Sequence, residues 1–300
     1  MSGSSALRYH VLDVFTDTPL TGNPLAVVFG GESLSDARMQ AIAAEFNLSE
    51  TVFVLPATRP GALVRARIFT PTLELPFAGH PTVGTACLLA DLGLAGEGEA
   101  LDIVLDEKVG PVPVRIRKSA DAPTYAELTT AVLPSFGEAP PAEVLADWLG
   151  LSVADLETDA DAPRGASCGV PYNLVPLRSI EALGRARLQA HKLAGARPVW
   201  SSSFYLYAAT HQYGVLRSRM FAPDLGVGED PATGSAAVAL CGHLADRSAA
   251  DGALGWTLLQ GVEMGRPSRL QITAEKRDGR IIAVKVGGQA VLIASGTLNL

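Results

Sequence analysis

One structural unit occurs twice in this chain, and the duplication limits the folds that the chain can adopt. The first copy runs from Arg67-Ile-Phe-Thr-Pro71 to Gly79-His80-Pro81. The second copy follows about 150 residues later and runs from Arg219-Met-Phe-Ala-Pro223 to Gly234-Ser235. In each copy a strand end leads through an acidic residue and a Gly-containing turn into a helix of small apolar residues. The repeat predicts two similar domains.

Each Gly-containing turn opens a helix, and such a turn is a candidate anion-binding site. The first backbone N–H groups of a helix have no intrahelical partner, and the helix dipole places positive charge at the same end. The turns at Gly79 and Gly234 can therefore hold an anionic group on their backbone amides. We expect the two turns to face one ligand.

The composition allows two hydrophobic cores and argues against some partners. The chain has 300 residues, of which 48% are hydrophobic, and this is enough apolar surface for two cores of ordinary size. A net charge of −7 leaves no general basic surface, so nucleic-acid binding is not expected. The start of the chain lacks a signal-peptide pattern, and no apolar run reaches about 18 residues. We expect a cytoplasmic protein with no membrane contact.

The cysteine and histidine spacings indicate neither a disulfide framework nor a metal site. Cys87, Cys168 and Cys241 are far apart, and the five His residues are equally scattered, without CxxC or HExxH spacing. The Gly-rich connector 260–268 lacks the lysine-hydroxyl pair of a P-loop and the glycine spacing of a dinucleotide-binding loop. We expect no metal and no organic cofactor.

Glu50 is the first candidate for acid-base chemistry. A helix is expected from the favourable N-cap Ser35 to Asn47, which can close it in the left-handed conformation, and residues 51–55 are expected to form a strand. Glu50 lies between these two elements. A carboxylate at such a junction is commonly a solvated strand-end residue. If the side chain points inward, burial would raise the pKa of the carboxyl group and make it a general base near neutral pH.

His80 and Asp230 lie at the two turns, and each has a structural alternative. His80 either caps the start of the expected helix 82–92 or takes part in an anion site. Asp230 precedes the turn Thr233-Gly234-Ser235, where Asp commonly serves as a helix N-cap. The positions of both residues at related turns favour a functional role.

The domain boundary is expected at a polar break, and several further elements follow from periodicity. The break at 118–123 divides a first domain, 1–123, from a second domain, 124–300, and an alternative returns the last strand, about 290–300, to the first domain. In the second domain, apolar periodicity predicts that residues 179–193 are largely helical. It also predicts a hairpin of strands 281–286 and 290–293 at the end of the chain.

An ordered set of motifs along nearly the whole chain resembles one known family. The motifs are Asp13-Val-Phe-Thr16, Gly22-Asn-Pro-Leu-Ala-Val-Val28, Asn47-Leu-Ser-Glu-Thr51, Phe77-Ala-Gly-His-Pro81, Glu229-Asp-Pro-Ala-Thr-Gly-Ser-Ala236 and Gln260-Gly-Val-Glu-Met-Gly-Arg-Pro-Ser268. In this order they resemble the PhzF-like family, named after a phenazine-biosynthesis isomerase, within the diaminopimelate-epimerase fold group. Each motif alone is weak, but their joint order is specific.

The resemblance implies a fold and a class of activity. The fold is α/β (α+β), with two similar domains that each wrap a barrel-like, mostly antiparallel sheet around a central helix. The active site lies in the cleft between the domains. The activity is that of a cofactor-independent isomerase acting on a small carboxylate-bearing substrate, and the family resemblance also implies a homodimer.

The resemblance also implies roles for the candidate residues. In the phenazine enzyme, the glutamate that matches Glu50 removes a proton from one carbon of a cyclic dihydro-hydroxy acid and returns it to another. The residues that match His80 and Asp230 assist this transfer. The residue that matches Ser235 and the amides of the turns at Gly79 and Gly234 hold the substrate carboxylate. Oriented N–H dipoles stabilise the negative charge that develops on such an acid.

Two alternatives remain for the activity. The related epimerases and proline racemase use two cysteines at the turns, where this chain has Ala78-Gly79 and Asp230-Pro231, which excludes their two-thiol mechanism. An epimerase or racemase acting at one carbon by another base remains the enzymatic alternative. A metabolite-binding or protein-interaction member of the fold without turnover is the other. Acid-base residues at positions 50, 80 and 230 argue against a mere binder. The sequence does not name the substrate.

Overall fold

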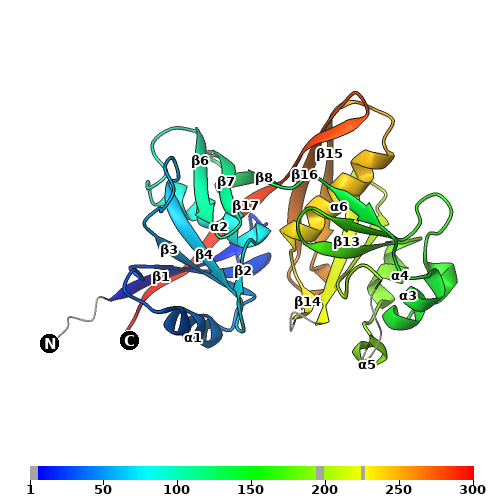
Figure 1. The fold of residues 1–300 in the computed structure, drawn as a ribbon, viewed down its shortest axis with the longest axis horizontal. Helices are drawn as coiled ribbons and strands as arrows, with labels where there is room; N and C mark the ends of the chain where they lie inside the picture. The colour runs from blue at the N-terminus through cyan, green and yellow to red at the C-terminus, as the bar shows by residue number, and fades with distance from the viewer. Residues whose placement is uncertain (1–5, 194–198, 224–226) are drawn as a thin grey trace. The chain divides into compact units, whose positions relative to one another are not determined.

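The chain folds into two compact units in a computed structural model that describes residues 6–193, 199–223 and 227–300. Unit 1 comprises Met1–Thr129 together with Gly287–Leu300, and unit 2 comprises Thr130–Val286 (Figure 1). Each unit has its own sheet and its own enclosed helix, and each is described by itself below.

The strands of unit 1 form a closed barrel of eight strands. Hydrogen-bonded pairing runs in the order β17-β1-β2-β3-β4-β6-β7-β8 and returns to β17. The pairs β2–β3 and β4–β6 are parallel. The strands are β1 (Leu7–Val14), β2 (Asn23–Phe29), β3 (Glu50–Leu55), β4 (Val64–Phe69), β6 (Ala100–Glu107), β7 (Gly110–Arg117), β8 (Tyr125–Thr129) and the end of β17 (Arg280–Leu298), with the short β5 (Glu74–Leu75) paired to β4.

Helix α2 (Gly79–Asp91) lies within this sheet and contacts β1, β2, β3, β7 and β8 (Figure 1). Its residues from Gly79 to Ala90 are all buried. The contact is closest at Gly84, where a Cβ atom would lie 2.6 Å from Val14 Cγ2 and 2.7 Å from Leu25 Cδ2. A helix that is apolar on all faces needs such an enclosure. The expected enclosed helix is therefore present, although it begins three residues before the expected 82–92 segment.

Unit 2 repeats the same order of elements. Its strands pair in the order β9-β10-β11-β12-β13-β15-β16, and the pairs β11–β12 and β13–β15 are parallel. Helix α6 (Gly234–Arg247) packs against β10, β11, β15 and β16. The strands are β9 (Ser135–Gly137), β10 (Arg164–Ser167), β11 (Pro171–Leu177), β12 (Phe204–Ala209), β13 (Val215–Ala222), β15 (Gly252–Gln260) and β16 (Ser268–Arg277), with the short β14 (Val227–Asp230) paired to β13. The predicted fold class, a barrel-like mostly antiparallel sheet around a central helix, is confirmed.

The smaller helices cover the outer faces of the sheets, and their ends follow from local sequence. Helix α1 (Asp36–Phe46) begins after Ser35, whose Oγ accepts a hydrogen bond from the N–H of Arg38 at 3.3 Å. It ends at Asn47 in the left-handed conformation with φ 51°. Both ends were expected from the capping preferences of these residue types. The other elements of this kind are α3 (Ala142–Leu149), α4 (Ile180–Arg185), α5 (Ala190–Leu193) and the 3₁₀ turns η1 (Val153–Asp155) and η3 (Val262–Met264).

Two predicted elements differ in the structure. The expected hairpin of 281–286 and 290–293 is wrong, because Arg280–Leu298 is one continuous strand, β17. Gly287 lies between the two expected strands, and a Cβ atom there would lie 2.3 Å from the Tyr125 hydroxyl oxygen, so the glycine permits a close approach of β8. The expected helix 179–193 is two short helices, α4 and α5, because the backbone leaves the helical conformation at Ala186.

Candidate active site

In unit 1 the structure brings Glu50 and His80 together. Glu50 is the first residue of β3 and pairs with Leu25 of the parallel strand β2. His80 is the second residue of α2. The Nδ1 atom of His80 lies 3.2 Å from the Oε2 atom of Glu50, and the two side chains are 4% and 17% exposed, respectively. A carboxylate next to an imidazole is an arrangement that can accept and donate protons.

The imidazole of His80 is neutral at neutral pH. Burial lowers the pKa of His80 to about 3, and a hydrogen bond to the backbone at Pro24 opposes this shift only in part. Nδ1 also lies 3.4 Å from the amide nitrogen of Asn23. The other ring nitrogen, Nε2, is buried and has no hydrogen-bond partner among the residues that the structure describes. A neutral imidazole has one donor and one acceptor, so it can orient the Glu50 carboxylate through one nitrogen and contact a ligand through the other.

The prediction that His80 caps α2 is wrong. The N-cap residue is Ala78, with φ −151° and ψ 139°, and the start of the helix has no side-chain cap. His80 lies inside the first turn, and its ring is directed toward Glu50. Because Ala78 has no hydrogen-bonding side chain, the first N–H groups of α2 remain without a side-chain acceptor.

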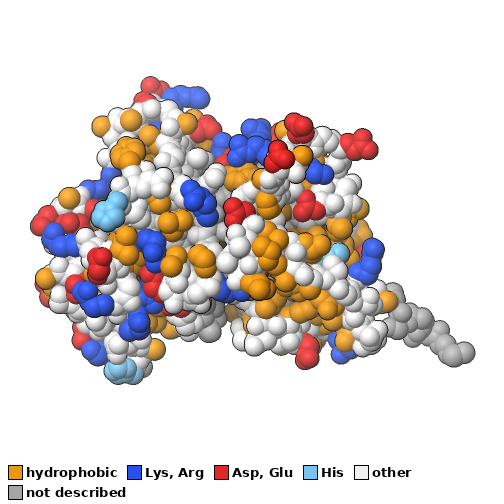
Figure 2. Space-filling view, turned by 180° about the vertical axis from the view of Figure 1, so that it is seen from behind, with side chains coloured by type: hydrophobic (Ala, Val, Ile, Leu, Met, Phe, Trp, Pro, Cys, Tyr) orange, Lys and Arg blue, Asp and Glu red, His pale blue; other side chains and the backbone are white. Residues whose placement is uncertain are grey.

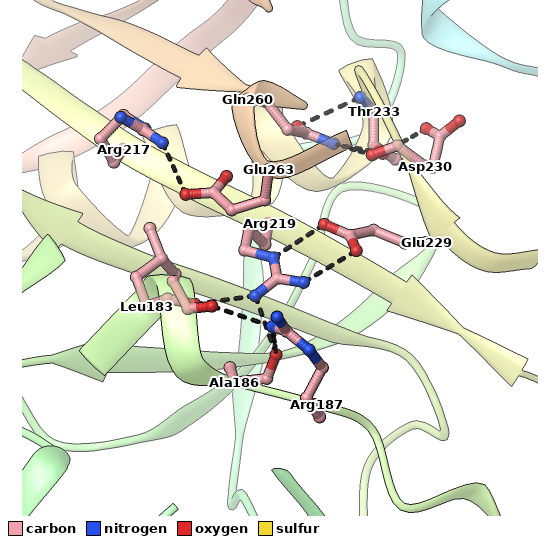
Figure 3. A network of polar contacts seen from close by, with 11 residues as sticks. Leu183, Ala186, Arg187, Arg217, Arg219, Glu229, Asp230, Thr233, Gln260 and Glu263 are labelled. Carbon is pink, nitrogen blue, oxygen red and sulfur yellow. Dashed lines mark hydrogen bonds and ion pairs between the residues drawn. The ribbon is translucent and has the colours of Figure 1, made fainter. Parts of the chain in front are cut away.

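In unit 2 the turn before α6 is held by a dense network of hydrogen bonds. Asp230 is buried, and its Oδ2 accepts a hydrogen bond from the Thr233 hydroxyl at 2.5 Å. The amide nitrogen of Gln260 donates to the backbone oxygen of Asp230 at 2.8 Å and lies 3.0 Å from Thr233 Oγ1 (Figure 3). The N-cap of α6 is Thr233, so Asp230 holds the preceding turn and is not itself the cap.

Gly234 and Ser235 are the first two residues of α6. The hydroxyl of Ser235 lies 2.8 Å from the hydroxyl of Tyr172 on β11. The N-cap residue Thr233 makes no side-chain hydrogen bond to the helix start, as at α2. Glu50, His80 and Gly79 are thus grouped in unit 1, and Asp230, Gly234 and Ser235 in unit 2. That the two turns serve one ligand stays a prediction.

In each unit the repeated arginine binds a glutamate on the short strand that pairs with its own strand. Arg219 is buried and donates to Glu229 from Nε and Nη2 at 2.7 and 2.8 Å, and its Nη1 donates to the backbone oxygens of Leu183 and Ala186 (Figure 3). In unit 1 the Nε atom of Arg67 donates to Glu74 at 2.8 Å. Planar guanidinium groups suit such paired contacts.

Sequence reasoning missed several polar residues next to the candidate site. Gln260 was taken as part of a connector, yet it ends β15 and bonds the Asp230 turn. The hydroxyl of Tyr205 donates to Gln260 Oε1 at 2.9 Å. In unit 1, Glu107 and Thr82 form a buried pair at 2.6 Å. The position of Gln260 within a recognised motif was the one available signal.

The three cysteines are buried and free. Burial raises the pKa of the Cys87 and Cys241 thiols far above the ordinary value, and raises that of Cys168 to about 12. Such thiols are inert as nucleophiles or bases near neutral pH. Within the described part of the chain, no three His, Cys, Asp or Glu side chains are grouped as metal ligands would be. Acidic and basic side chains are interspersed on the face shown in Figure 2.

Comparison with known proteins places the chain in a family. Residues 12–296 match the model of the phenazine biosynthesis-like protein family. The chain is 39% identical to a trans-2,3-dihydro-3-hydroxyanthranilate isomerase of Pseudomonas aeruginosa, over 98% of this chain and 99% of that protein. It is 42% identical to an uncharacterized isomerase of Mesorhizobium japonicum, over 97% of this chain and 98% of that protein.

A solved structure supports the same assignment. The crystal structure of a PhzF-family phenazine biosynthesis protein of Bacillus anthracis superposes with a TM-score of 0.85 at 25% identity, covering 99% of this chain and 100% of that chain. The protein is therefore an isomerase by class. It belongs to the phenazine biosynthesis-like, or PhzF, family, as its motifs predicted. Among the described residues, no helix is long and apolar enough to cross a membrane.

Proposed function

We propose that the protein moves a proton between two carbons of a small carboxylate-bearing substrate, with Glu50 as the group that accepts and returns the proton. His80 orients Glu50 and contacts the substrate through Nε2. Asp230 assists, and the amides at Gly79 and Gly234 with the Ser235 hydroxyl bind the substrate carboxylate. The resemblance to relatives that are isomerases supports this assignment.

The observation that carries the proposal is the pairing of Glu50 with a neutral histidine. His80 Nδ1 lies 3.2 Å from Glu50 Oε2, and this close polar contact limits where the carboxylate can lie. Burial keeps the pKa of His80 at about 3, so the imidazole does not compete with Glu50 for the transferred proton. One carboxyl group that takes and returns a proton is sufficient for a shift within one molecule.

The two helix-opening turns support recognition of a carboxylate. Both α2 and α6 begin without a side-chain cap, so their first N–H groups can donate hydrogen bonds to an anion. Ser235 adds a hydroxyl that is already positioned by Tyr172 at 2.8 Å. We propose that both turns contact the same substrate, because the family resemblance implies it. The same resemblance underlies our proposal of a homodimer in the cytoplasm that uses no metal or organic cofactor.

The isomerase assignment and the epimerase alternative differ in the product. A shift between two carbons moves a double bond, whereas an epimerase inverts one carbon. The raised pKa values of Cys87 and Cys241 argue against a thiol base in either reaction. Trans-2,3-dihydro-3-hydroxyanthranilate, named for the Pseudomonas aeruginosa relative, is the first substrate to test.

Deuterium incorporation from heavy water tests the proposal. The wild type and Glu50→Gln are incubated with a panel of cyclic and amino-acid-like carboxylates that includes trans-2,3-dihydro-3-hydroxyanthranilate. We expect the wild type to place deuterium on a carbon other than the one that loses hydrogen, and Glu50→Gln to do so at least about 100-fold more slowly. Deuterium returned only to the original carbon with inverted configuration would identify an epimerase. Equal rates in the two proteins would remove Glu50 from its role.

A further inference from the structure

Glu107 and Gln260 occupy equivalent positions at the ends of β6 and β15. Gln260 pairs with Ser218, the residue that directly precedes Arg219 in the parallel strand β13. In unit 1 the parallel strands β4 and β6 pair up to Arg65 and Asp106. The next step along both strands places Glu107 opposite the residue that directly precedes Arg67. The duplication therefore equates the acid in unit 1 with the amide in unit 2.

Gln260 uses both ends of its amide to hold the turn that opens α6. Its nitrogen donates to the backbone oxygen of Asp230 at 2.8 Å. Its oxygen accepts from the backbone N–H of Thr233, the N-cap residue, at 3.3 Å (Figure 3). The same oxygen accepts from the hydroxyl of Tyr205 at 2.9 Å. An uncharged group with one donor and one acceptor side is what this position requires.

The oxygen atoms around Glu107 in unit 1 need two protons. Thr82 Oγ1 lies 2.6 Å from Glu107 Oε1 and 2.7 Å from the backbone oxygen of Ala78. Both distances are hydrogen-bond distances, but a carbonyl oxygen carries no proton and a hydroxyl carries one. If the Thr82 proton points to Ala78, the contact with Glu107 needs a proton from the carboxyl group. Each contact has a proton of its own only when Glu107 is a neutral carboxylic acid.

We propose that Glu107 is a positioning residue of the substrate site. The neutral acid donates to Thr82, the Thr82 hydroxyl donates to the oxygen of Ala78, and this fixes the peptide group between Ala78 and Gly79. The C=O and N–H of a trans peptide point in opposite directions in one plane, so fixing the oxygen aims the Gly79 N–H. That N–H is a donor to the substrate carboxylate in the proposed function, on which this inference rests.

The surroundings of Glu107 agree with a neutral acid. The side chain is 2% exposed, and burial raises its pKa from 4.5 to about 8, with the Thr82 hydrogen bond as the opposing effect. The charged neighbours are Arg59, which donates to the backbone oxygen of Glu107 and pairs with Asp106, and the adjacent Lys108. Burial is the cause of the raised pKa, the Thr82 hydrogen bond opposes it, and no charged neighbour contributes.

The proton itself can be observed without a substrate. In the infrared spectrum at neutral pH, the carbonyl stretch of a protonated carboxylic acid is expected in the wild type and absent from Glu107→Gln. Asp102→Asn changes an exposed carboxylate on the same strand, and it should keep the band. Wild-type and Glu107→Gln spectra that are identical in this region would overturn the proposal.

The effect of Glu107 on the peptide group between Ala78 and Gly79 can be measured from the NMR resonance of the Gly79 amide. In the wild type this resonance should shift with a midpoint near pH 8, the pKa of Glu107. In Glu107→Gln the side-chain amide still donates to Thr82, so the resonance should stay at its neutral-pH position. A wild-type Gly79 resonance that does not titrate, or that titrates equally in Glu107→Gln, would contradict the proposal.

Measurements of KM with a substrate distinguish a positioning role of Glu107 from a role in stability alone. Above pH 8 the KM of the wild type should rise by about tenfold, the effect of losing one oriented donor to a carboxylate, and the KM of Glu107→Gln should not. Thr82→Val should raise KM at neutral pH, and Thr82→Ser should restore it. A Glu107→Gln variant whose KM follows the wild-type pH profile would contradict the positioning role. If Gly79 titrates as expected but Glu50→Gln is fully active, the proposed function fails and the control of the peptide by Glu107 stands.

Discussion

The two units have the same order of strands and the same enclosed helix, but their chemistry differs at equivalent positions. Glu50 directly precedes Thr51, which pairs with Phe69, and in unit 2 Ser203 directly precedes Phe204, which pairs with Phe221. A carboxylate in unit 1 therefore corresponds to a hydroxyl in unit 2. The duplicated sheet supplies two similar turns, and only one of them has a carboxylate at this place.

The same contrast appears at the strand ends that hold the turns. Glu107 in unit 1 titrates, with its pKa raised to about 8, whereas Gln260 in unit 2 cannot. The contacts that Gln260 makes with the unit 2 turn therefore do not depend on its own protonation, whereas in the proposal Glu107 fixes the unit 1 turn only while the acid keeps its proton.

The largest expected effect compares the two repeated arginines. Arg219→Met leaves Glu229 and two backbone oxygens without their donor in a buried place, which should cost about 3–5 kcal/mol in the free energy of unfolding. Arg67→Met should cost less, because one of its partners, Asp36, is largely exposed. Urea unfolding of both variants measures the difference. Equal losses would mean that the two positions are not as different as their burial indicates.

Glu107→Gln and Gln260→Glu exchange the acid and the amide at the two equivalent strand ends and so test how they differ. The pKa of Glu107 is about 8 in the folded protein and 4.5 in its ordinary state. Protonation of Glu107 therefore stabilises the fold fully below pH 4.5, and this stabilisation is lost as the pH rises from 4.5 to about 8. The free energy of unfolding of the wild type should fall by about 1.4 kcal/mol per pH unit across that window relative to Glu107→Gln. Gln260→Glu should add a similar slope in unit 2. Chemical denaturation at a series of pH values measures both slopes, and parallel curves for all three proteins would contradict the account.

A smaller effect is expected at the second residue of each enclosed helix. His80→Ala removes the group that fixes Glu50, so kcat should fall by about tenfold or more. Ser235→Ala removes only a hydroxyl donor to the substrate carboxylate, so it should raise KM more than it lowers kcat. Steady-state kinetics with a confirmed substrate separate the two outcomes. A Ser235→Ala variant that loses kcat as strongly as His80→Ala would place acid-base chemistry in unit 2 as well.

Much of the fold could be predicted because its signals are local. Ser35 and Asn47 mark the ends of α1 through their own capping preferences, and the small apolar residues after each Gly-containing turn indicate enclosed helices. Glycine was ambiguous, since it marks turns as well as close approaches. Gly287 in the extended β17 makes room for Tyr125, which the local sequence does not reveal.

The candidate site was harder to predict in detail. Glu50 and His80 could be selected from motifs, but the orientation of the His80 ring toward Glu50 depends on packing of α2 against the sheet. No pattern in the sequence indicated Glu107, and only its place in a motif indicated Gln260. Their roles depend on the register of parallel strands and on contacts with Thr82, Ala78 and Asp230, which are distant in sequence.

The difference between Glu50 and its counterpart Ser203 is tested most directly by solvent deuterium exchange. Glu50→Gln and the matched control Ser203→Ala are compared with the wild type on a confirmed substrate, and folding of each variant is checked by thermal unfolding. Glu50→Gln should fold, still bind substrate and exchange at least about 100-fold more slowly, and Ser203→Ala should exchange at nearly the wild-type rate. A folded Glu50→Gln variant that incorporates deuterium as fast as the wild type would show that another residue carries the proton.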